Sequence, residues 1–137
     1  MIPRYRFLGA LARAGLVCAF VGAHYFAYQF CVDAFAELVG IPGDPSLVYA
    51  ALLLQGLLTA GALTLLFVYP LAYVFRQRAS VVAAAMVAPV LALQIAVMLD
   101  AHYRAVTNLI LSLDVLMLAL LLVGGAWLVS RANVKTV

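Results

Sequence analysis

Residues 47–99 read LVYAALLLQGLLTAGALTLLFVYPLAYVF, then RQRA, then SVVAAAMVAPVLALQIAVML. About 20 apolar residues in helical form cross the hydrocarbon core of a bilayer, and both long parts of this stretch reach that length. Arg76 and Arg78 separate them immediately after Phe75. Because so short a connection joins antiparallel neighbours, the stretch predicts two transmembrane helices, residues 47–75 and 80–99.

Two further apolar segments flank this hairpin, at residues 7–30 and 109–129. The composition, with 69% apolar and 9% charged residues and a mean hydropathy of +1.18, lies far outside the range of soluble globular domains. The segments are continuously apolar instead of alternating, which favours helices over a barrel. We therefore predict an all-α membrane protein with a single domain, residues 1–137, of four transmembrane helices in an antiparallel up-down bundle.

The charged residues divide between the two sides of this predicted topology. All five acidic residues fall on one side, and seven of the eight basic residues fall on the other, with Arg104 as the exception. Basic residues mark cytoplasmic loops, so the pattern predicts that both termini lie inside, in a bacterial cytoplasmic (inner) membrane. The basic residues are Arg4, Arg6, Arg13, Arg76, Arg78, Arg131 and Lys135; the acidic ones are Asp33, Glu37, Asp44, Asp100 and Asp114.

The longest predicted connection lies on the outer side, around residues 40–46. Residues 32–39 before it keep a helical spacing, so the first helix either continues outward or bends along the surface. Residues 41–45 supply turn chemistry, and Ser46 is of a type that caps helices. We expect Ser46 to cap the second helix.

Small residues recur every fourth position along the predicted third helix. Such spacing permits close approach of backbones, which drives helix association where lipid offers no hydrophobic advantage. The pattern predicts that this helix packs against another helix of the chain or of a second copy. Gly56 and Ala60 in the second helix form a less specific counterpart. The packing ridge of the third helix comprises Ser80, Ala84, Ala88, Ala92 and Ala96.

Polar side chains gather in the outer half of the predicted bundle, and Asp114 is the most informative of them. It lies about five residues inside the fourth helix, where an unpaired carboxylate costs on the order of 2–3 kcal/mol. Arg104 is the simplest partner, and Asp100 competes for it at a favourable spacing. The group is either a structural network or handles protons or cations. This candidate polar cluster comprises Asp114, Arg104, Asp100, His102, His24 and Asn108.

The two histidines, His24 and His102, are expected near the outer ends of parallel helices. The simplest role there is hydrogen bonding at the membrane interface. Two imidazoles between helices can also ligate a haem iron, which makes haem b an alternative. No spacing typical of metal ligands occurs, so neither a metal site nor a cofactor is predicted.

No motif in the sequence names a reaction. A Cys-x-x-Cys pair, a glycine-rich phosphate loop and a Gly-x-Ser-x-Gly elbow are all missing, so no catalytic residue is predicted and an enzymatic role stays undecided. The small-residue ridge favours a multi-pass protein that acts by association, as a homo-oligomer or as an accessory subunit of a membrane complex. The alternative is a small oligomeric transporter, flippase or channel with an outward-facing polar vestibule. The expected partners are the lipid bilayer and copies of itself or other membrane subunits, without nucleic acid.

Overall fold

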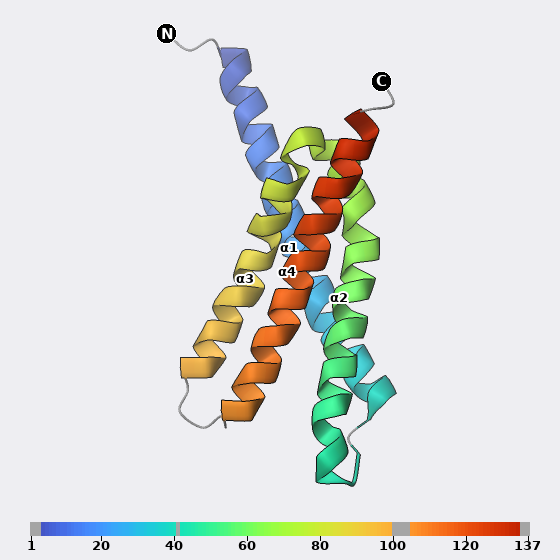
Figure 1. Ribbon diagram of the computed structural model, residues 1–137. Helices are drawn as coiled ribbons and strands as arrows, with labels where there is room; N and C mark the ends of the chain where they lie inside the picture. The colour runs from blue at the N-terminus through green and yellow to red at the C-terminus, as the bar shows by residue number, and fades with distance from the viewer. Residues whose placement is uncertain (1–3, 41, 100–104, 135–137) are drawn as a thin grey trace.

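The computed structural model describes residues 4–40, 42–99 and 105–134; the side chains described are those of residues 9–40, 42–44, 47–99, 109–110 and 112–132. The described chain is helical apart from short connections (Figure 1). Its elements are α1 (Arg4–Val39), α2 (Pro45–Phe75), the 3-10 turn η1 (Arg76–Arg78), α3 (Ala79–Leu99) and α4 (Ala105–Val134).

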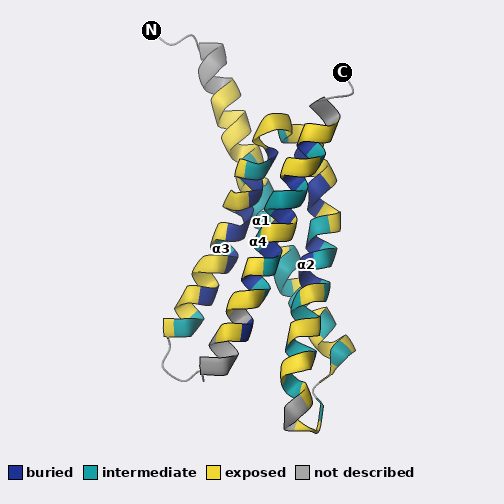
Figure 2. Ribbon diagram, in the orientation of Figure 1, coloured by how far each residue is buried: buried dark blue, intermediate teal, exposed yellow. Residues whose placement is uncertain are grey.

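Three apolar stretches of these helices are long enough to cross a membrane: Gly9–Val39, Leu47–Leu99 and Ser112–Ala132. The second passes through α2, η1 and α3, so it accommodates two spans and the total is three to four. Large apolar side chains cover the outside of the helices, and Leu65 is 75% exposed; Figure 2 shows exposed residues along every helix. Length, hydropathy and this apolar exterior indicate an integral, multi-pass membrane protein.

The reversal between α2 and α3 agrees with the prediction made from the two arginines. Phe75 ends α2, and Arg76 adopts a φ of +47°, the left-handed conformation that turns a chain out of a helix. A single 3-10 turn then leads into α3, and Figure 1 shows the two helices running in opposite directions from this turn. The side chains of Arg76 and Arg78 are exposed there.

Helix α1 continues past residue 30 as one helix to Val39, which is the first of the two alternatives predicted for residues 32–39. Gly40 follows it with a φ of +68°, and its N–H donates to the carbonyl of Ala36 at 3.0 Å, as in helices ended by glycine. The expected capping role of Ser46 is wrong, because α2 already begins at Pro45. Proline is favoured at a first helical position, which places Asp44 at the N-cap, and the N–H of Leu47 donates to its carbonyl at 3.1 Å.

Helix α4 packs against α2 and α3 on one side, and α1 packs against the same two helices on the other. In Figure 1, α4 lies in front and α1 crosses diagonally behind. The most extensive packing is between α2 and α4, and the buried side chains recur at three- and four-residue spacing, the period of a helix face. The buried core includes Leu63, Phe67 and Leu71 of α2, Ala83, Met86 and Val90 of α3, and Val115, Leu118 and Leu122 of α4.

Candidate functional site

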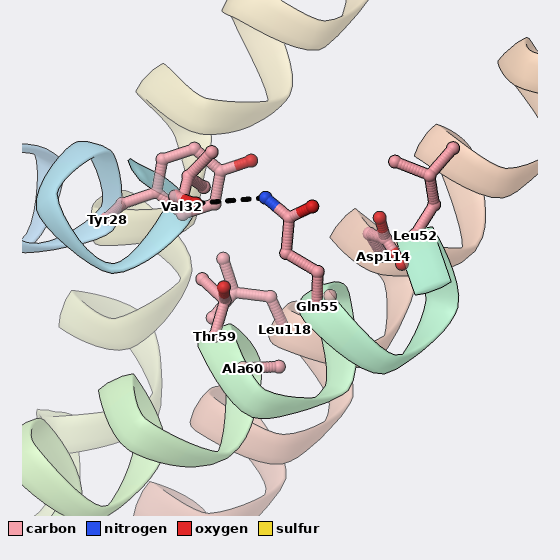
Figure 3. Close-up of a pocket in the computed structure, with 9 residues that line it drawn as sticks. Tyr28, Val32, Leu52, Gln55, Thr59, Ala60, Asp114 and Leu118 are labelled. Atoms are coloured by element: carbon pink, nitrogen blue, oxygen red, sulfur yellow. Dashed lines mark hydrogen bonds between the residues drawn. The ribbon is translucent and has the colours of Figure 1, made fainter. Parts of the chain in front are cut away.

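A small, partly open cavity lies where α1, α2 and α4 meet, at the edge of the apolar core. Its volume is about 100 Å³, and it combines apolar walls with hydroxyl, amide and carboxylate groups. Figure 3 shows its lining side chains, drawn from these three helices. They are Tyr28 and Val32 from α1; Leu52, Gln55, Gly56, Thr59 and Ala60 from α2; and Asp114 and Leu118 from α4.

The contact that brings α4 to this cavity is between Asp114 and Gly56. A Cβ atom added at position 56 would overlap the Asp114 carboxylate, with both carboxylate oxygens and the carboxylate carbon in the way. Any residue other than glycine at position 56 would therefore force the Asp114 side chain or α4 to shift. The missing side chain gives the carboxylate room against the backbone of α2.

The Asp114 carboxylate is poorly satisfied in this position. Its Oδ1 is buried and makes no hydrogen bond, and no described side chain forms an ion pair with it. Buried polar groups in proteins are normally hydrogen-bonded, and buried charges are normally paired. An unpaired carboxylate beside a cavity is therefore the most unusual polar feature of the described chain.

Three other polar side chains line the same cavity. Thr59 is only 3% exposed, and its Oγ1 makes no hydrogen bond. The Nε2 of Gln55 donates to the carbonyl of Val32 at 2.9 Å, and Figure 3 shows its amide oxygen directed away from that bond. Tyr28 lies within electrostatic reach of the Asp114 carboxylate. Each of these three side chains carries an oxygen atom.

The expected polar cluster is tested in only two of its members. Asp100, His102 and Arg104 lie outside the described residues, and so does the predicted pairing of Arg104 with Asp114. Asn108 belongs to α4, but its side chain is not among those described. Of the cluster, the structure therefore places Asp114 at the cavity and His24 elsewhere.

His24 is fully buried among the helices, 15 residues before the end of α1. Its ring meets Phe67 of α2 edge-on, with 5.4 Å between ring centroids, and neither ring nitrogen makes a hydrogen bond. The predicted hydrogen bonding at the membrane interface and the haem alternative both remain predictions, because each also involves His102, which lies outside the described residues.

The predicted packing ridge of α3 does not pack within the chain. Ser80 is half-buried, and the other four positions of the ridge, Ala84, Ala88, Ala92 and Ala96, are exposed. The buried face of α3 lies on the opposite side of the helix, where larger residues pack against the neighbouring helices. That buried face comprises Ala79, Val82, Ala83, Met86, Val87, Val90 and Gln94.

Sequence reasoning singled out Asp114 but assigned other cavity residues to different roles. From the sequence alone, Tyr28 belongs with the aromatic residues expected to form a belt at the outer membrane interface, and Thr59 lies in the nearly apolar inner half of the predicted bundle. These residues come together because Asp114 of α4 packs against Gly56 of α2. A single sequence does not show which glycine lies opposite which acidic residue.

Comparison with protein-family models, curated proteins and solved structures gives no match for this chain.

Proposed function

We propose that the four helices are four spans, with both termini and the α2–α3 turn on the cytoplasmic side of a bacterial inner membrane. The start of α1, the end of α4 and that turn lie at the same end of the helices (Figure 1). Arg76, Arg78 and Arg131 belong to this end, whereas Asp33 and Glu37 precede the opposite end of α1. Such a distribution of basic residues is typical of cytoplasmic loops.

Within this topology, we propose that the protein acts by association, as a homo-oligomer through the outward face of α3, or as an accessory subunit through the same face. The observation that carries the proposal is the exposure of Ala84, Ala88, Ala92 and Ala96 on a face opposite the buried one. A lipid-facing helix gains nothing from alanine over leucine, whereas a helix interface gains close backbone approach.

Replacement of Ala88 by leucine tests this proposal. The added bulk separates the helix backbones, so the variant is expected to be monomeric in nanodiscs where the wild type is oligomeric, by native mass spectrometry. Ala23→Leu is the matched control, because Ala23 is an exposed alanine on α1, and it should leave the oligomer intact. An Ala88→Leu oligomer of unchanged mass would refute self-association at this face.

The alternative, a small oligomeric transporter, flippase or channel, is favoured by a different observation. An unpaired carboxylate beside a cavity is the kind of intramembrane group that marks ion or substrate pathways. Replacement of Asp114 by asparagine is expected to abolish flux in proteoliposomes while leaving membrane insertion unchanged. Equal flux by the variant and the wild type would remove this alternative.

A further inference from the structure

The Asp114 carboxylate lies in a predicted span with its negative charge uncompensated by any described side chain. Gly56 leaves room for it, since a Cβ atom at this position would occupy the same space. A charge of this kind in a membrane requires a partner of opposite sign or contact with water. The carboxylate lines the cavity, so the cavity offers a place where such a partner or water can reach it.

The groups facing that cavity define what can enter. Thr59 is almost completely buried and its hydroxyl oxygen has no hydrogen-bond partner. Gln55 commits its amide nitrogen to Val32, which leaves its oxygen available, and Tyr28 adds a phenolic oxygen. Carboxylate, amide and hydroxyl oxygens are the ligands preferred by hard cations.

The charge and the volume of the cavity limit which class of cation it can bind. The cavity supplies one negative charge, so a divalent ion would leave a net positive charge in a low-dielectric setting, which is unfavourable. Among the described residues, no group of three histidine, cysteine or acidic side chains is placed to hold a metal, which argues against a transition metal. A volume of about 100 Å³ holds an ion with about two waters at roughly 30 Å³ each, and is well below that of pockets for organic ligands.

We propose that this cavity binds one monovalent alkali-metal cation, with Asp114 as the countercharge and Thr59, Gln55 and Tyr28 as neutral oxygen ligands. The inference deepens the transport alternative and rests on the same cavity, but it does not require flux. An ion that only binds would complete the packing of α1, α2 and α4.

The test compares thermal unfolding of the purified protein in sodium, potassium and choline chloride at equal ionic strength and fixed pH. Choline is the control cation, because its methyl groups keep oxygen ligands away from its charged nitrogen. The unfolding temperature of the wild type should be higher in the bound cation's chloride than in choline chloride. The expected difference is on the order of 5–10 °C when the cation concentration is about 100 times its Kd. Asp114→Asn should lose this dependence and unfold at one temperature in all three salts. Binding of radioactive sodium, displaced by unlabelled sodium or potassium chloride, gives a second measurement.

Threonine variants provide the matched pair. Thr59→Val removes a ligand and should raise the Kd about tenfold. Thr64→Val also removes an unpartnered hydroxyl oxygen of α2 but lies outside the cavity lining, so its Kd should stay at the wild-type value. This pair decides the matter even when Asp114→Asn fails to fold.

Identical unfolding of the wild type in all three salts, together with no displaceable sodium binding, would overturn the cation site. Equal salt dependence in Thr59→Val and Thr64→Val would overturn the assignment to this cavity. Binding without flux in proteoliposomes would leave the cation site standing and refute transport alone.

Discussion

Two glycines lie where α2 and α4 pack most closely, and they meet very different neighbours. A Cβ atom at position 125 of α4 would lie 3.1 Å from Cγ2 of Val68 and 3.6 Å from Cγ2 of Thr64, whereas one at position 56 of α2 would overlap the Asp114 carboxylate. The first contact is ordinary apolar packing of a membrane helix pair. The second gives a charged group room inside the same interface, which packing alone does not require.

The largest expected effect comes from breaking the polar contact with Gly56→Ala. The new methyl group takes the space of the Asp114 carboxylate, so α4 must shift or the carboxylate must move into the cavity. We expect the free energy of unfolding to fall by about 2–3 kcal/mol, measured by titration with sodium dodecyl sulfate in mixed micelles. A loss below about 0.5 kcal/mol would show that the carboxylate moves away freely.

A smaller effect is expected at the apolar contact. In Gly125→Ala, the methyl group requires Val68 to yield by a few tenths of an ångström, and alanine recovers part of the cost through its higher helix propensity. We expect a loss of about 1 kcal/mol, measured by the same titration. Adding Val68→Ala should remove the clash between the two side chains. A loss as large as that of Gly56→Ala would mean that the two contacts are equivalent.

The smallest effect is expected at Gly61, which serves as the reference for both contacts. A Cβ atom at this position of α2 meets nothing within 4 Å. Gly61→Ala should therefore raise the free energy of unfolding by about 0.5 kcal/mol, through helix propensity alone. A loss at this position would indicate that any side chain added to α2 perturbs the helix, and that the clash at position 56 is not specific.

The sequence predicted the helices far better than their mutual contacts. Hydropathy and the two arginines of the α2–α3 turn placed the reversal correctly, because span length and chain reversal are local properties. The continuation of α1 to Val39 was predicted only as one of two alternatives, since Asp33 and Glu37 in its last turns are also typical of a surface segment. Gly40 follows the last residue of α1, and a glycine after a helical segment is a local sequence feature that predicts a helix end.

Of the residues that line the cavity, the sequence predicted only Asp114 as part of a site. Asp114 is unusual in any apolar helix and was found for that reason. Thr59 and Tyr28 were assigned by depth alone, because the rotation of each helix about its axis is set by tertiary packing. The same limitation explains the ridge of α3, where alanines repeat regularly in sequence yet face outward, while larger residues such as Met86 face the core.

The most direct test of the account is the coupling between Gly56→Ala and Asp114→Ala in a double-mutant cycle of unfolding free energies. If the glycine exists to make room for the carboxylate, removing the carboxylate should abolish most of the cost of Gly56→Ala. The account predicts a coupling free energy of about 2 kcal/mol between the two positions. Additive effects, within the roughly 0.5 kcal/mol expected of independent sites, would contradict it.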